Sequence, residues 1–196
     1  MVAKALSHND LAELKSINLS YNHFDGGAVF KIGNSLSESI QSIDLSNNSI
    51  GSSGTKGLIP LFDSKKFPFL RKLNLENNNI ADIGLNTIIP SIFRNMSISV
   101  LNISHNKLSD ASCTFIKKLL LNSSYLQELY LHWNKFSSYG GILIAQGLAE
   151  NLNIKVGLYF LFLLQMDLII YYFIMVRVFH LLKFFFVFNE GVRLEP

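Results

Sequence analysis

Few side chains in this sequence have the types and spacing that covalent or metal chemistry needs. The only cysteine, Cys113, shares a helical spacing with Ile116 and Leu120, so we expect a small buried residue rather than a nucleophile. His105 and His132 are expected on adjacent structural units but in neighbouring columns, without carboxylate partners at ligand spacing. The sequence therefore predicts no catalytic residue, no metal site and no cofactor.

The charged residues do not favour acid–base catalysis, phosphate binding or nucleic acid binding. Asp44 and Glu76 have Lys72 nearby, which suits a solvated polar surface better than general acid–base catalysis. No glycine-rich phosphate-binding loop followed by Lys and Ser or Thr occurs. The 17 Lys and Arg exceed the 14 Asp and Glu by a net charge of only +3, and no basic run is longer than two residues. We expect a protein partner and no nucleic acid.

One stretch carries side chains typical of protein interfaces. Tyr130, His132 and Trp133 are large and amphipathic, and Tyr and Trp are over-represented among interface hot spots. They are predicted to contact the partner, although they could instead cover the next repeat or the segment that follows. With the polar residues of neighbouring strands, the predicted partner-binding residues are Asp44, Lys72, Asn74, Glu76, Glu128, Tyr130, His132 and Trp133.

These residues lie in a repeated frame, in which apolar residues at fixed positions precede an asparagine. Five copies occur, and their asparagines, spaced by 26, 30, 28 and 28 residues, are Asn22, Asn48, Asn78, Asn106 and Asn134. The alternation of apolar and polar residues before each asparagine fits a short strand. After it, a small residue falls at the sixth position and apolar residues fall at the tenth and fourteenth, on one face of a helix. Each unit is predicted as strand, turn and helix.

A unit of this length cannot bury its own apolar face, but stacked units share one continuous core. We therefore predict an α/β solenoid: a short curved arc with parallel strands on the concave face and helices on the convex face. Each asparagine side chain can both donate and accept, so the five asparagines are expected to form a structural ladder that satisfies backbone groups where the strands turn away.

Over residues 11 to about 156 the chain resembles the leucine-rich repeat superfamily, and within it the ribonuclease-inhibitor-like class. The resemblance lies in the repeated frame, its period and the helical second half of each unit. The resemblance implies a non-enzymatic module that binds a protein partner on its concave face. Two alternatives stay open. One is a GTPase activator resembling the Ran GTPase-activating proteins, although none of their functional residues can be matched here. The other is a membrane-tethered receptor arm.

The repeats depart from the family pattern in three ways. The first unit is two residues short, and Pro60 and Pro90 occupy the twelfth position after the asparagine, where each removes a helical N–H. Short or kinked helices are expected at these prolines. No polar cap is evident at either end, so the chain could be a fragment of a longer solenoid.

The repeat pattern stops abruptly at residue 157. We assign residues 1–156 to the repeat domain and residues 157–196 to a hydrophobic, aromatic-rich tail. Residues 158–176 contain one charge, Asp167, so a membrane contact is expected only through this window. The other interpretations are a packed terminal element and an unspliced-intron artefact beginning after Val156. The single cysteine suits a reducing compartment, and the cytoplasm is the expected location, with membrane anchoring as the alternative.

Overall fold

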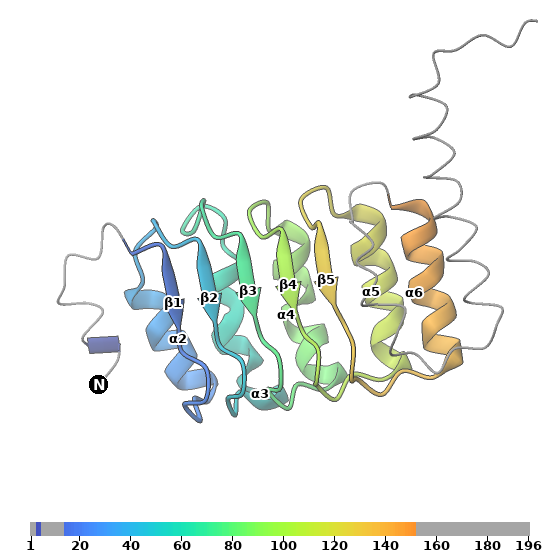
Figure 1. Cartoon of the computed structure of the whole chain (residues 1–196), viewed down its shortest axis with the longest axis horizontal. Helices are drawn as coiled ribbons and strands as arrows, with labels where there is room; N and C mark the ends of the chain where they lie inside the picture. The colour runs from blue at the N-terminus through green and yellow to red at the C-terminus, as the bar shows by residue number, and fades with distance from the viewer. Residues whose placement is uncertain (1–2, 5–13, 152–196) are drawn as a thin grey trace, which may run out of the picture.

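The computed structural model of the chain describes residues 3–4 and 14–151, and these residues form two parallel layers, one of strands and one of helices (Figure 1). The five strands are β1 (Ser16–Asn18), β2 (Ser42–Asp44), β3 (Lys72–Asn74), β4 (Val100–Asn102) and β5 (Glu128–Tyr130). The helical segments are α2 (Gly26–Ser35), α3 (Gly51–Gly54), the 3-10 helix η1 (Thr55–Phe62), α4 (Asp82–Arg94), α5 (Asp110–Asn122) and α6 (Ser138–Glu150).

The five strands form one parallel sheet in sequence order, β1-β2-β3-β4-β5. Each strand pairs with the next in the register that the repeat frame requires, so that the middle residues Ile17, Ile43, Leu73, Leu101 and Leu129 stand side by side. These middle residues point toward the helices, and their neighbours point away from them. The predicted α/β solenoid of parallel strands and helices is confirmed. We call the side of the sheet turned away from the helices the sheet face.

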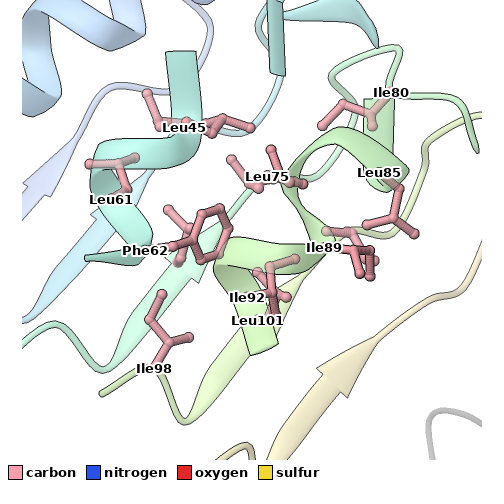
Figure 2. Packing of buried hydrophobic residues seen from close by; sticks show 14 of the residues in the cluster. Leu45, Leu61, Phe62, Leu75, Ile80, Leu85, Ile89, Ile92, Ile98 and Leu101 are labelled. Carbon is pink, nitrogen blue, oxygen red and sulfur yellow. The ribbon is translucent and has the colours of Figure 1, made fainter. Parts of the chain in front are cut away.

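The core runs without interruption between the two layers. Figure 2 shows side chains of η1, the strands and α4 converging on it, among them Phe62, Leu75 and Leu101. In the three inner units the frame positions are buried almost completely: Ile43, Leu73 and Leu101 are each 1% exposed. In the first and fifth units several frame residues are only partly buried. Because every unit contributes to the same core, the stacking of units rather than any single unit stabilises the fold.

Small residues let the helices approach each other closely. A Cβ atom added to Gly26 of α2 would lie 2.1 Å from the carbonyl oxygen of Gly54, and one added to Gly57 would lie 1.9 Å from the carbonyl oxygen of Gly26. At Gly140 of α6 an added Cβ would lie 2.8 Å from the sulfur of Cys113. Gly140 occupies the sixth position after the asparagine, as do Gly54 and Gly84, where an added Cβ would lie 2.8 Å from the backbone nitrogen of Gly26 and 2.8 Å from the Cα of Ser52, respectively. Helix contact therefore favours a small residue at this position.

Carboxylates at helix starts link one unit to the next. Asp82 Oδ1 accepts a hydrogen bond from the backbone N–H of Ser109 at 2.9 Å, and Asp82 Oδ2 accepts one from the Ser109 hydroxyl at 2.7 Å. Asp110 repeats this contact with Ser137 of the next unit. The hydroxyls of Ser109 and Ser137 also cap α5 and α6. Partial burial raises the pKa of the Asp82 carboxyl group, but hydrogen bonds from Ser112 and Ser109 together outweigh it and hold that pKa below its ordinary value.

The two prolines have different effects. Pro60 lies in η1, and its unit contains only a four-residue α-helix followed by the 3-10 helix, as expected for a disrupted helix. Pro90 lies inside α4, which nevertheless runs for 13 residues, the same length as α5 and α6. Of the two outcomes expected at Pro90, a short or a kinked helix, the shortening is therefore wrong. Burial of Leu85, Ile88 and Ile92 offsets the single hydrogen bond that the proline removes.

The tail at residues 157–196, including the window 158–176, lies outside the described residues, as does the boundary at residue 156. Among the helices of residues 14–151, none has the length and apolar character needed to cross a membrane.

Candidate functional site

The sheet face is lined by polar side chains that project from the strands. The last residue of each of the first four strands faces away from the helices and forms an Asx turn. Its side-chain oxygen accepts a hydrogen bond from the backbone N–H two residues later, at 2.8–3.1 Å; these residues are Asn18, Asp44, Asn74 and Asn102. In each case one side-chain oxygen bonds to the chain directly after the strand and stabilises the turn that ends it. In the fifth strand the position holds Tyr130, whose hydroxyl donates to Glu128 Oε2 at 2.9 Å.

Large rings gather at the β5 end of this face, where the strands finish. His105 stacks on Trp133 with ring centroids 5.5 Å apart and an angle of 25° between the planes. His132 meets His105 edge to face at 5.5 Å, and Tyr130 meets His132 edge to face at 6.3 Å. His105 Nε2 lies 3.8 Å from Glu76 Oε1. We call these five residues, Glu76, His105, Tyr130, His132 and Trp133, the His–Trp cluster.

Sequence reasoning missed part of this cluster. His105 was expected to have no carboxylate partner at ligand spacing, and Glu76, 29 residues earlier on the neighbouring unit, was not recognised as the residue that places a carboxylate oxygen 3.8 Å from its Nε2. The sequence does contain a signal: His105 and Trp133 each directly precede a frame asparagine, so they occupy the same column in two adjacent units. Four predicted residues lie outside the cluster: Asp44 on β2, Lys72 and Asn74 on β3, and Glu128 on β5, where its carboxylate accepts from the Tyr130 hydroxyl.

Electrostatics favour a neutral His132. Partial burial lowers the pKa of His132 below its ordinary value of 6.5, and the nearby His105 lowers it further, while Glu76 acts in the opposite direction. A neutral imidazole offers one donor and one acceptor nitrogen, whereas an imidazolium offers two donors. At neutral pH the cluster therefore presents aromatic rings and hydrogen-bonding groups beside the carboxylate of Glu76.

The residue before each frame asparagine has a left-handed backbone. The φ angles of these five residues are positive, between 51° and 59°, and the residues are Tyr21, Asn47, Asn77, His105 and Trp133. Asn and His occur in this conformation more often than most residues, whereas Tyr and Trp carry a larger steric cost there. Trp133 and Tyr21 are nevertheless 60% and 76% exposed, so burial does not require the rings there. Backbone strain at exposed aromatic residues is a feature of functional sites.

The frame asparagines lie beneath this column and bond to the backbone of two units. Asn106 Oδ1 accepts from the N–H groups of Asn78 and Ile80, at 3.1 and 2.9 Å. Its Nδ2 donates to three carbonyl oxygens, those of Leu75, Ile103 and Ser104. Asn48 and Asn134 make bonds of the same kind, and Asn22 bonds within its own turn.

Asn78 is different, because its Oδ1 atom has no hydrogen-bond partner within the described part of the chain. In the other units this oxygen accepts the N–H located two residues after the preceding asparagine. The equivalent residue, Ile50, already has helical backbone angles, and Gly51 follows with a φ of 62°. The short helical turn in this unit thus removes the donor that Asn78 would use.

Residues 3–4 and 14–151 show neither a metal-binding group nor an activated nucleophile. They contain no group of three or more His, Cys, Asp or Glu placed to hold a metal ion. Cys113 is fully buried, and burial, with help from Asp110 and Asp82, raises the pKa of its thiol to about 12. A thiol with this pKa is protonated at neutral pH and does not act as a nucleophile.

Comparison with known proteins supports the repeat assignment. The leucine rich repeat family model matches residues 37–58, 68–88 and 94–117. Protein NLRC5 of Mus musculus is 26% identical over 140 residues, which are 70% of this chain and 7% of that protein. Ribonuclease inhibitor of Sus scrofa is 28% identical over 113 residues, 57% of this chain and 24% of that protein. The chain thus spans a quarter or less of the length of these relatives.

Among solved structures, leiomodin-1 actin-binding site 2 aligns with a TM-score of 0.48 and 14% sequence identity, over 89% of this chain and 84% of that one. The assignment itself rests on the register of the five strands, the repeated frame and the family match. The repeats of this chain form a leucine-rich repeat segment of the ribonuclease-inhibitor-like class.

Proposed function

We propose that this chain is a non-enzymatic protein-interaction module whose partner binds the sheet face around the His–Trp cluster. The leucine-rich repeats themselves suggest a protein–protein interaction module. The observation that carries the finer proposal is Trp133, which is 60% exposed, stacked on His105 and held in a left-handed backbone conformation. Nothing in folding alone favours a large exposed ring at a strained position.

The cluster has the physical properties of an interface hot spot. Tyr130, His132 and Trp133 offer large apolar area with polar edges, and their rings are already fixed by contacts with one another. A pre-ordered ring loses little conformational entropy when a partner covers it. The surrounding Asx-turn residues would form a polar rim that contributes complementarity rather than most of the binding energy.

The charge of the face favours a partner segment with basic or amide side chains. Asp44, Glu76 and Glu128 outnumber Lys72, although the whole chain carries a net charge of +3. Opposite charge on the partner would raise the association rate and fix its orientation. Added salt should therefore slow association more than it speeds dissociation.

A photo-crosslinking amino acid at position 133 tests the proposed contact, with the same amino acid at Tyr139 as the matched control. Tyr139 is 65% exposed but lies in the first turn of α6, away from the sheet face. The proposal predicts one protein crosslinked from position 133 and not from 139, and that protein must then bind the chain when purified. Equal crosslinking from both positions would contradict it.

The expected cytoplasmic location and the two alternative functions are separable by further measurements. Stimulated GTP hydrolysis by small GTPases would replace the non-enzymatic proposal with GTPase activation. Retention of the chain in membranes after alkaline extraction would favour the membrane-tethered alternative over a cytoplasmic module.

A further inference from the structure

The solenoid has two edges of different chemistry. At one edge the helices begin, and the carboxylates Asp25, Asp82 and Asp110 lie there. At the other edge the helices end and the next strands begin. We call the second one the helix-end edge and define it by three successive connections with the adjoining last helical residues: 63–71, 93–99 and 121–127.

Exposed apolar side chains gather on the helix-end edge. Met96 is 61% exposed, Phe69 52% and Tyr125 48%, and Phe93 and Leu121 are also exposed. Phe69 and Tyr125 each directly precede the first frame residue of their unit, so both occupy one column, two units apart. Inside the same connection Phe67 is fully buried and anchors the loop that presents Phe69. The core therefore holds the loop while Phe69 stays in solvent.

Positive charge accompanies these apolar side chains. The three segments contain four cationic residues, Lys65, Lys66, Arg71 and Arg94, and one carboxylate, Asp63, for a net charge of +3. Arg71 is used internally, because its guanidinium donates to the carbonyl oxygens of Pro68 and Ser97. Lys65 and Arg94 are exposed. Lys66 is partly buried, and its ammonium donates to Asn34 Oδ1 at 2.8 Å and lies 5.4 Å from the centre of the Phe67 ring.

The chain leaves the repeats at this same edge. Helix α6 ends at Glu150, and its C-cap Asn151 is buried among the described residues. Only six residues separate Asn151 from Leu158, where the apolar window begins, so the window starts within about 25 Å of the edge even if the link is fully extended. A lipid bilayer that received residues 158–176 would therefore have its surface near the helix-end edge.

We infer that the helix-end edge docks on an anionic lipid surface. Phe69, Met96 and Tyr125 enter the interfacial layer, where aromatic and apolar side chains are favoured, and Lys65, Lys66 and Arg94 meet the phosphate groups. Each cation near an anionic leaflet adds to the affinity. The opposite edge also exposes apolar residues, including Ile83, but there Asp25, Asp82 and Asp110 outnumber Lys107 and Lys135, so the net positive charge of the helix-end edge is missing.

The experiment places a polarity-sensitive fluorophore on one edge at a time. The variants are Met96→Cys and, as the matched control from the opposite end of the same helical unit, Ile83→Cys, both in the full chain. Cys113 can stay in place, because it is the only native cysteine, is fully buried and has a thiol pKa of about 12. The labelled proteins are mixed with vesicles of phosphatidylcholine alone or with phosphatidylserine added.

The inference predicts a blue shift at position 96, and none at position 83, only on vesicles that contain phosphatidylserine. Lys65→Gln with Lys66→Gln should weaken the vesicle affinity roughly 10- to 30-fold. Lys107→Gln with Lys135→Gln removes the same charge from exposed positions near the other edge and should change the affinity less than threefold by the same reasoning. Co-sedimentation with vesicles but no shift at position 96, equal shifts at both positions, or the same shift without phosphatidylserine would each overturn the inference.

Discussion

Replacing Asn106 by Ala should destabilise the chain far more than replacing Asn78 by Ala, although both side chains are buried at the same frame position of adjacent units. Asn106→Ala removes five hydrogen bonds. Two of the carbonyl oxygens keep another donor, because Ile103 is also bonded by Asn134 and Ser104 by Asn77. The groups left without a partner are the N–H of Asn78, the N–H of Ile80 and the carbonyl of Leu75.

The expected cost follows from those three groups. A buried backbone group without a partner costs about 1–2 kcal/mol, so Asn106→Ala should lower the free energy of unfolding by roughly 3–6 kcal/mol. Asn78→Ala leaves no carbonyl without a partner, because Leu45 keeps the bond from Asn48 and Glu76 keeps the bond from Asn47. It also removes the Oδ1 atom that has no partner. Its expected cost is about 1 kcal/mol or less.

Urea unfolding measures this difference. Far-UV circular dichroism follows the helices, and the fluorescence of Trp133, the only tryptophan, follows the β5 end of the sheet. Both probes should show the larger loss for Asn106→Ala. Equal losses in the two variants, or a larger loss for Asn78→Ala, would refute the hydrogen-bond reasoning and leave side-chain volume as the main contribution of the ladder.

Three further predictions concern glycine packing, ionisation and backbone strain. Gly26→Ala should lower the free energy of unfolding by about 2 kcal/mol or more, because its Cβ would overlap the carbonyl of Gly54, whereas Gly27→Ala should raise it by about 0.5–1 kcal/mol in urea unfolding. The pKa of His132 is lowered in the folded state, so its contribution to the free energy of unfolding is complete above pH 6.5 and is lost as the pH falls. His132→Gln should therefore reduce the loss of unfolding free energy between about pH 7 and pH 5, measured by unfolding curves at each pH. The same pH dependence in the variant and the wild type would contradict this. Tyr21→Asn should stabilise the chain by up to about 1 kcal/mol, since Asn tolerates the φ of 59° better, and a destabilised variant would count against strain at this column.

The repeat frame predicted the fold because its period and its apolar positions leave one way to bury the leucines. Local departures were harder to predict. Pro60 accompanies a short α-helix and a 3-10 helix, while Pro90 does not shorten α4, and the difference depends on how much apolar area each helix buries, which the proline alone does not reveal. Even the missing partner of Asn78 depends on the turn at Ile50 in the preceding unit.

Four of the five cluster residues, Glu76, Tyr130, His132 and Trp133, were predicted from the sequence, and His105 was missed. Tyr130, His132 and Trp133 belong to one unit, so the sequence groups them directly. The contributions of His105 and Glu76 come from two earlier units and depend on side-chain reach as well as on column position. Asn47, Asn77 and His105 suit a left-handed backbone at the column before each asparagine, but Tyr21 and Trp133 at the same column hide that signal.

The central claim is that exposed aromatic residues of the sheet face bind a protein partner, and the most direct test is the dissociation constant of the purified partner. The variant Tyr130→Ala with Trp133→Ala removes two rings of the cluster, and Tyr139→Ala removes an equally exposed ring from α6. We predict at least a 30-fold weaker affinity for the double variant, from about 2 kcal/mol of lost hot-spot contacts, with unchanged far-UV circular dichroism and wild-type affinity for Tyr139→Ala. Unchanged affinity in the folded double variant, or equal losses in both variants, would contradict the account.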